Sequence, residues 1–394
     1  MISRILNISE IIDNNGSAFL FGARGTGKTF LAKKWLESEY KPFSIDLLNP
    51  EFYQRYLARP QQLLLDIEGA LINRNSTLTV FIDEIQKIPP LLEIVHKLYT
   101  DHQGKIRFLV SGSSARKLKR GGADLMAGRL VTLNLYPYCF SEYEQPISEY
   151  LLLGSLPVIM ANPSNAERLL RAYVNTYLKE EVLEEALVRK IDVFSRFLEI
   201  AGQFHGKIIN FSSIASALNV SSHSVKSYFQ ILDDTLIGFT IPGWSASPKK
   251  QLRTAPKFYL FDNGVASTLR GELRLQLSEG SSRYGELFEA MIIQETVRIN
   301  DYNQLDLKFS YWQTVNGHEV DLILSRGLGQ PLAAIEIKSS TSVNPKKLKG
   351  LYSFKKDYPD IPVYYCFCRT PYPYTEDNIS FLPWQEGLKK VTEI

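Results

Sequence analysis

The chain has 394 residues, of which 44% are hydrophobic and 22% are charged, and its formal net charge at pH 7 is +3. A chain of this length is too long to fold around one hydrophobic core, so we expect two or three domains. Because the net charge is close to zero, any nucleic-acid-binding surface must be a local patch of positive charge. No apolar run is long enough to span a membrane and the N-terminus lacks a secretory pattern, so we expect a cytoplasmic protein without membrane insertion.

A phosphate-binding loop is expected near the N-terminus. SAFLF predicts a buried strand and FLAKKWLESEY predicts a helix, so GARGTGKT lies between a strand and a helix. Backbone N–H groups of such a loop can surround the phosphates of ATP. Lys28 is expected to reach the β- and γ-phosphates and the Thr29 hydroxyl to bind Mg²⁺. The predicted ATP site comprises Gly22, Ala23, Arg24, Gly25, Thr26, Gly27, Lys28, Thr29 and Asp83.

Two further strands are expected to bring polar side chains to the same edge of the sheet. Residues 79–82 form an apolar run that ends at Asp83 and Glu84, and the apolar run in IRFLVSGSSA ends at Ser111. Ligands of α/β sheets bind at the carboxyl ends of the strands. We therefore expect Asp83 to bind Mg²⁺ and Glu84 to polarise the attacking water. Ser111 is expected to sense the γ-phosphate, with a simple turn as the alternative.

The order of these segments resembles that of AAA+ ATPases. Further segments along nearly the whole chain are FLVSGSSA, LMAGRL, LNLYPYCFSEY, GSLPVIM, TYLKEEV, KFYLFDNG and WQTVNGHEVDLIL. Together they resemble one subgroup, the bacterial and archaeal ATPases that have a C-terminal domain of unknown function. The resemblance implies a homo-oligomer, expected to be a hexameric ring in which an arginine completes each ATP site.

The arginine that completes the ATP site is not obvious in the sequence. No second sensor arginine stands in a helical lid after the ATPase core, so Arg129 in MAGRL is the candidate. It would act on its own nucleotide or on that of a neighbouring subunit. The alternatives are a surface arginine or one that pairs with Asp124.

A helix-turn-helix is expected in the middle of the chain, within residues 208–241. Ser212 or Ser213 is expected to begin a short helix, Asn219 to accept a left-handed conformation at the turn, and Ser221 or Ser222 to begin a second helix. With the strand that follows, this pattern predicts a winged helix whose second helix enters the DNA major groove. The exposed face of that helix would comprise Ser222, His223, Ser224, Lys226, Ser227 and Gln230.

Positive charge near this helix is needed for DNA binding, because phosphate contacts supply much of the affinity. The predicted recognition helix has one lysine on its exposed face, and Lys249, Lys250 and Arg253 would add charge near the wing. A protein–protein docking role is the alternative. A second lysine-rich stretch, residues 346–356, could line a DNA path or form a solvated helix.

A carboxylate and lysine constellation is expected in the last third of the chain. Glu289 lies in a patterned helix, Asp321 lies in a strand, and Glu336 and Lys338 are two residues apart on a further strand and share a face. Such carboxylates can bind Mg²⁺ or Mn²⁺, and the lysine can assist hydrolysis.

Helix Glu, strand Asp and Glu-x-Lys resemble the core of PD-(D/E)XK nucleases. The resemblance implies a metal site formed by Glu289, Asp321 and Glu336, with the Ile337 carbonyl as a further ligand and Lys338 as a catalytic group. Val320 stands where that family has a proline. The alternative is an inactive scaffold that keeps the fold.

These predictions combine into one α/β architecture: an AAA+ P-loop ATPase domain, a winged helix-turn-helix and a restriction-endonuclease-like α/β domain. We expect the ATPase in residues 1–140, a helical connector in 141–200, the winged helix in 201–262 and the nuclease-like domain in 263–394. The expected function is ATP hydrolysis coupled to remodelling, translocation or branch processing of DNA. The competing hypothesis is an ATP-driven regulatory switch whose C-terminal modules dock proteins.

Overall fold

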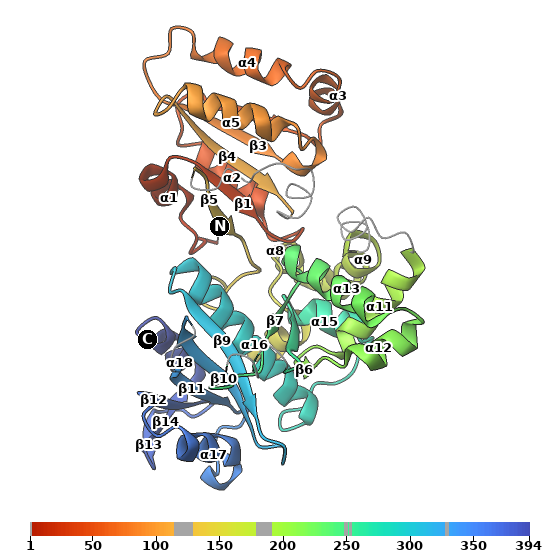
Figure 1. Ribbon diagram of the computed structural model, residues 1–394, viewed down its shortest axis with the longest axis vertical. Coiled ribbons are helices and arrows are strands. Elements are labelled where there is room, and N and C mark those ends of the chain that lie inside the picture. Colours follow the sequence, from red (N-terminus) through yellow and green to blue (C-terminus); the bar gives the residue numbers. More distant parts are fainter. Residues whose placement is uncertain (1, 114–128, 179–190, 248–250, 252–253, 328–330) are drawn as a thin grey trace. The chain divides into compact units, whose positions relative to one another are not determined.

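The computed structural model describes residues 2–113, 129–178, 191–247, 251, 254–327 and 331–394. The chain divides into two compact units (Figure 1). The first is built mainly from Met1–Tyr138, and the second from Cys139–Asn175, Val188–Asp233 and Ile237–Ile394. Predicted residues Lys249, Lys250, Arg253 and Asp124 lie outside the described residues.

The first unit is built on a parallel five-stranded sheet with the order β2-β3-β4-β1-β5. The strands are β1 (Ala18–Phe21), β2 (Phe43–Asp46), β3 (Leu78–Asp83), β4 (Ile106–Gly112) and β5 (Val131–Asn134). The helices are α1 (Ile8–Asn15), α2 (Lys28–Leu36), α3 (Pro50–Ala58), α4 (Gln62–Leu71) and α5 (Leu91–Asp101), with a 3-10 turn at Ile85–Lys87. Strands β1 and β3 are buried along their whole length, which explains their unbroken apolar sequences. The three strands predicted around the ATP site are therefore confirmed.

The second unit begins with helices and a small antiparallel sheet of order β6-β8-β7. The helices are α7 (Ile147–Leu153), α8 (Pro157–Met160), α9 (Ala166–Ala172), α11 (Ile191–Gln203), α12 (Phe211–Leu218), α13 (Ser222–Asp234) and α15 (Asn263–Leu269), with a 3-10 turn at Pro163–Asn165 and a π-helical turn at Tyr173–Leu178. The strands are β6 (Lys207–Ile208), β7 (Gly238–Ile241) and β8 (Lys257–Leu260).

The two helices predicted in the middle segment are present, but one predicted cap is wrong. Helix α12 begins after Asn210, whose side chain accepts a hydrogen bond from the Ser213 backbone N–H at 3.0 Å, so neither Ser212 nor Ser213 is the cap. Asparagine is as good a cap as serine and stands one position before the helix. Asn219 has the expected left-handed conformation, with φ of 53°. The Ser221 hydroxyl accepts from the Ser224 N–H at 3.1 Å and caps α13, as predicted.

The second unit ends in a six-stranded sheet with the order β13-β14-β12-β11-β10-β9. Strands β9 (Leu307–Gln313), β10 (Glu319–Arg326) and β11 (Pro331–Ile337) are antiparallel neighbours, whereas β12 (Val363–Cys368) and β14 (Ile379–Pro383) run parallel to β11. The remaining elements are α16 (Ser282–Tyr302), α17 (Lys349–Asp357), β13 (Tyr374–Glu376) and α18 (Trp384–Val391), with a 3-10 turn at Pro345–Lys347. Within the described residues, every helix is too short or too polar to cross a lipid bilayer.

A buried polar network fixes α16 against its neighbours in the second unit. The Arg298 guanidinium donates to the Glu295 carboxylate at 2.8 Å, to the Tyr150 hydroxyl at 2.9 Å and to the Ser155 hydroxyl at 3.2 Å. The Ser155 backbone N–H donates to the Asp262 carboxylate at 2.7 Å. A buried charge is tolerated only when it is paired and hydrogen-bonded, so this network fixes the position of the helix that bears Glu289.

Candidate nucleotide and cation sites

The phosphate loop connects the end of β1 to the start of α2. A Cβ atom at Gly22 would lie 2.4 Å from the Leu135 carbonyl oxygen, and Gly27 has a φ of 95°, so both positions require glycine. Lys28 is the first residue of α2 and is buried. Its ammonium donates to the carbonyl oxygens of Gly22 at 2.6 Å and Ala23 at 3.4 Å. The predicted lysine is therefore folded back against the loop that would surround the phosphates.

Hydroxyl groups surround the carboxylate of Asp83 at the end of β3. Thr29 donates to one carboxylate oxygen at 2.7 Å, and Ser111, at the end of β4, donates to the other. Asp83 and Ser111 are fully buried. Neutral hydroxyls orient this carboxylate without neutralising its charge, and oxygen donors of this kind suit Mg²⁺. The sequence predicted both Thr29 and Asp83 for that role, and the structure brings them together.

Glu84 follows β3 in a left-handed backbone conformation with a φ of 59°. Its backbone N–H donates to the Ser111 hydroxyl at 3.3 Å, so Ser111 contacts the Asp83 carboxylate and the Glu84 backbone. The Gln86 side-chain amide donates to the Glu84 carboxylate and, at 3.2 Å, to the Ser113 hydroxyl. Gln86 is buried and was missed by sequence reasoning, because a glutamine two residues after an acid is not by itself a signal.

Both arginines predicted near the nucleotide are exposed. Arg24 lies in the loop beside Gly25, whose φ is 85°, and Arg129 precedes β5. Arginines at these positions are accessible to solvent.

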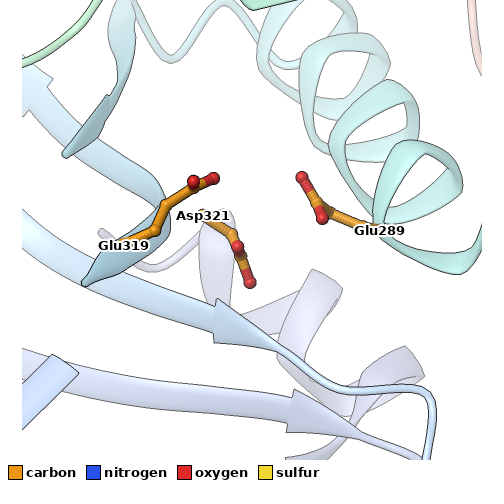
Figure 2. A group of neighbouring side chains, drawn as sticks. All are labelled: Glu289, Glu319 and Asp321. Carbon is orange, nitrogen blue, oxygen red and sulfur yellow. The ribbon is translucent and has the colours of Figure 1, made fainter. Parts of the chain in front are cut away.

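Three carboxyl groups meet between α16 and β10 in the second unit. Oxygen atoms of Glu289, Glu319 and Asp321 all lie within 4.8 Å of one another. Figure 2 shows Glu289 pointing from its helix towards the two acids of β10. Two of these acids, Glu289 and Asp321, were predicted. Glu319 was not, although it lies two residues before Asp321 and therefore on the same face of the strand.

A buried lysine lies against this cluster. The Lys257 ammonium is 3.2 Å from a carboxylate oxygen of Glu289 and also contacts the carboxylate of Glu319. The Tyr259 hydroxyl donates to Glu289 at 3.1 Å. Burial by itself lowers the pKa of Lys257, but the surrounding carboxylates outweigh it and raise that pKa above its usual value. The lysine is therefore charged.

Glu336, on β11, and Lys338, which directly follows β11, form an ion pair. Their ammonium and carboxylate groups are 2.6 Å apart, and the Ile337 backbone N–H donates to the Asp321 carboxylate at 2.7 Å. Burial raises the pKa of the Glu336 carboxyl, and the charge of Asp321 raises it further. Glu336 does not belong to the group of three carboxyls within 4.8 Å, so the predicted trio of Glu289, Asp321 and Glu336 differs from the cluster in the described residues.

The predicted DNA-facing helix α13 presents polar residues to solvent. Ser222, His223, Lys226 and Gln230 are exposed, whereas Ser224 and Ser227 are half-buried. In the lysine-rich stretch, the exposed residues are Lys346, Lys347, Lys349 and Lys356. Lys355 is half-buried, and its ammonium donates to the Asp377 carbonyl oxygen at close range.

Three family models match consecutive parts of the chain. Residues 14–144 match a family described as an AAA domain. Residues 144–277 match a domain of unknown function (DUF8612), and residues 284–386 match another (DUF4143). The AAA-domain match covers most of the residues that form the first unit, with its parallel sheet and phosphate loop.

Relatives are found among bacteria. A protein of Mycobacterium tuberculosis, described as uncharacterized, is 26% identical over 328 residues, which span 82% of this chain and 70% of the relative. An uncharacterized protein of Haemophilus influenzae is 22% identical over 395 residues, which span 92% of each chain.

Two solved structures of similar proteins are low-scoring matches. RuvB of Thermotoga maritima is 14% identical, with a TM-score of 0.30 over 60% of this chain and 90% of that one. The replication initiator DnaA, bound to AMPPCP and single-stranded DNA, is 17% identical, with a TM-score of 0.28 over 57% and 85% of the two chains.

Proposed function

We propose that this chain, whose first unit contains an AAA domain, hydrolyses ATP and uses the energy to remodel, move along or process branches of DNA. The observation that supports ATP hydrolysis best is the group formed by Thr29, Asp83 and Ser111 at the carboxyl edge of the sheet, beside the phosphate loop. In this group the buried Asp83 carboxylate accepts hydrogen bonds from two neutral hydroxyls, and Thr29, which donates one of them, follows Lys28 at the start of α2.

Each residue of the ATP site has a role in this proposal. Lys28 neutralises the β- and γ-phosphates, and Thr29 with Asp83 would bind Mg²⁺, which supplies charge neutralisation of the transferred phosphoryl group. Glu84 polarises the attacking water. Ser111 fixes the two acids and responds to the γ-phosphate. Arg129, exposed before β5, would complete the site of a neighbouring subunit in a homo-oligomer, for which we propose a hexameric ring.

The division of the remaining chain is also part of the proposal. We assign residues 1–140 to the ATPase, 141–200 to a helical connector, 201–262 to a winged helix and 263–394 to a nuclease-like domain. The pair α12–α13, followed by the strand pair β7–β8, supports the winged helix. The exposed polar face of α13 and the four exposed lysines of residues 346–356 support contact with DNA.

The effect of DNA on the rate of ATP hydrolysis tests this proposal directly. Steady-state hydrolysis is measured with no DNA and with duplex, single-stranded and branched DNA, and we expect at least one DNA to raise the rate. The variant Glu84→Gln provides the background rate in each case. If none of the three DNAs changed the rate of an active enzyme, the competing regulatory switch, in which the second unit docks proteins, would replace this proposal.

A second candidate activity is metal-dependent cleavage of DNA by the C-terminal domain. The cluster of Glu289, Glu319 and Asp321 favours it, because three carboxylates within 4.8 Å are suitable ligands for Mg²⁺ or Mn²⁺. Glu336 and Lys338 would be a further ligand and a catalytic group. The ammonium of Lys257 among these acids opposes it. Cleavage of linear, flapped and branched DNA with Mn²⁺, compared between the wild type and Asp321→Ala, tests this activity.

A further inference from the structure

The cation that would neutralise the acids of the second unit is already supplied by the chain itself. Lys257 is 4% exposed, and its ammonium contacts the carboxylates of both Glu289 and Glu319. The same ammonium lies 5.5 Å from the centre of the Tyr311 ring, which adds a cation–π contact. The positive charge therefore lies at the acid cluster, in contact with one acid of α16 and one acid of β10.

We propose that Lys257 takes the cation position among Glu289, Glu319 and Asp321, so that a divalent metal ion binds these acids only if this ammonium is removed. A Mn²⁺ ion within bonding distance of Glu289 and Glu319 would lie close to the ammonium that contacts the same two carboxylates. Like charges at such a distance repel strongly in a buried site. The metal and the lysine thus compete for one position.

The geometry of β8 keeps the lysine in this place. β8 is the middle strand of its sheet, and Lys257 is paired with Ile208 of β6 and with Ile241 of β7. The backbone of Lys257 cannot move away without breaking these pairs. A buried ammonium without a partner costs several kcal/mol, so rotation of the side chain away from the acids is also opposed.

Lys257 and Lys338 have different surroundings, although each pairs with a carboxylate. The side chain of Lys338 is 31% exposed and its partner is Glu336, whereas the side chain of Lys257 is 5% exposed and bridges two acids from different elements. Lys338 is the lysine that the sequence pattern predicts for catalysis. Lys257 is the one that determines whether the acids are available to a metal ion.

The inference is independent of ATP hydrolysis and bears only on the second candidate activity. With Lys257 in place, the C-terminal domain is expected to bind without cutting, because no metal ion would be present to activate water. The domain would then contribute its fold and surface to DNA binding.

Manganese titration of the full chain tests the proposal. Free Mn²⁺ is followed by electron paramagnetic resonance without nucleotide, and every protein has the Asp83→Asn background so that the first unit does not contribute. We expect no Mn²⁺ binding that depends on Asp321 up to about 1 mM, and an affinity at least about tenfold higher in Lys257→Met. The gain should disappear in Lys257→Met/Asp321→Asn. Lys257→Arg, which keeps the charge, should behave as Lys257 does.

Two outcomes would overturn the inference. One is Mn²⁺ binding by the chain with Lys257 intact that is lost in Asp321→Asn, since the metal and the lysine would then coexist. The other is a folded Lys257→Met protein that gains no binding. Thermal melting checks the fold, and Lys257→Gln replaces Lys257→Met if the latter is unfolded. The first outcome is tested with Lys257 intact, so it can be decided even if every Lys257 variant is unfolded.

Discussion

Asp83 at the end of β3 and Glu319 at the start of β10 are both held by neighbouring side chains, but the partners of the two acids differ. Asp83 accepts hydrogen bonds from the hydroxyls of Thr29 and Ser111, which are neutral. Glu319 is in contact with the ammonium of Lys257, which is charged. A carboxylate with neutral donors keeps its negative charge for an incoming cation, whereas a carboxylate with an ammonium partner is already neutralised.

This difference separates two kinds of acidic site that have similar sequences. From sequence spacing alone, the acids that follow β3 and the acids within β10 would both be expected to bind a metal ion. The partner atoms distinguish them. We propose that hydroxyl partners mark a site for Mg²⁺ and that a lysine from another sheet marks a site neutralised within the chain.

The largest effect is expected in the first unit, where the carboxylate of Glu84 should be essential. Glu84→Gln should bind ATP but lower its turnover about a thousandfold, which corresponds to about 4 kcal/mol of activation free energy, because the amide cannot polarise water. Single-turnover hydrolysis and equilibrium nucleotide binding measure the two effects separately.

Lys28→Ala is the matched comparison, because it removes the charge that faces the phosphates and should abolish turnover. Glu84→Asp keeps the carboxylate and should retain part of the activity. Turnover of Glu84→Gln at the wild-type rate would contradict the assignment of Glu84 as the group that activates water.

The second largest effect is expected on the stability of the two acidic sites. Lys257→Met leaves Glu289 and Glu319 without their cation and should lower the free energy of unfolding by about 3 kcal/mol. Asp83→Asn should cost less than about 1 kcal/mol, because the hydroxyls of Thr29 and Ser111 can reorient to accept from the amide. Denaturant unfolding of both variants measures the difference.

Lys308→Met provides the control, since this lysine is exposed in β9. It should unfold at the same denaturant concentration as the wild type. Equal losses in Lys257→Met and Lys308→Met would show that the buried ion pair does not stabilise the second unit. Millimolar Mn²⁺ should restore part of the stability of Lys257→Met, because a ligand that binds only the folded state stabilises it.

The arrangement that we propose to bind ATP was predictable because its residues depend on local sequence. The loop from Gly22 to Thr29 and the acids after β3 follow directly from strand and helix patterns, and a parallel sheet brings strand ends together. Asn210, by contrast, replaced the predicted serine caps, because several good cap residues stand close together there.

The acid cluster was only half predictable because its partners are distant in the sequence. Glu289 and Asp321 lie in elements that the pattern identifies. Lys257 is 32 residues from Glu289 and begins a short strand of another sheet, where a lysine has no sequence signal that would distinguish a buried position from an exposed one. Long-range pairing of this kind becomes visible only when the two sheets are placed together.

His205 extends the comparison to a buried group whose partners are all neutral. Its two ring nitrogens contact the Asn263 side-chain oxygen and the Leu260 backbone N–H, both at 3.0 Å. Burial lowers the pKa of His205 from 6.5 to about 4, although the Asn263 contact opposes this shift. The unfolded chain therefore binds a proton near pH 6.5, but the folded chain does not until about pH 4.

Acid should consequently destabilise the fold through His205. The full contribution is present above pH 6.5, and about 2 kcal/mol should be lost by pH 5, because only the unfolded state is protonated in this interval. Unfolding measured between pH 7.5 and pH 5 should show a smaller decline in His205→Gln, whereas the exposed His223→Gln should follow the wild type. Identical declines in wild type and His205→Gln would contradict this account.

The smallest effect per residue is expected at the cations that the sequence predicts to contact DNA. Lys28 and Lys257 are buried against carbonyl or carboxylate oxygens, so DNA phosphates must be met by exposed side chains. Replacing Lys249, Lys250 and Arg253 with alanine should weaken DNA binding and flatten its salt dependence, since each lost phosphate contact lowers the log–log slope by about 0.9.

The triple alanine variant of Lys33, Lys34 and Lys105, which removes equal charge from the first unit, is the control. If the first triple variant kept its affinity and slope, the same replacements at Lys346, Lys347 and Lys349 would be the next test, because those exposed lysines border α17. Loss of the slope in the control alone would instead place the DNA path on the first unit.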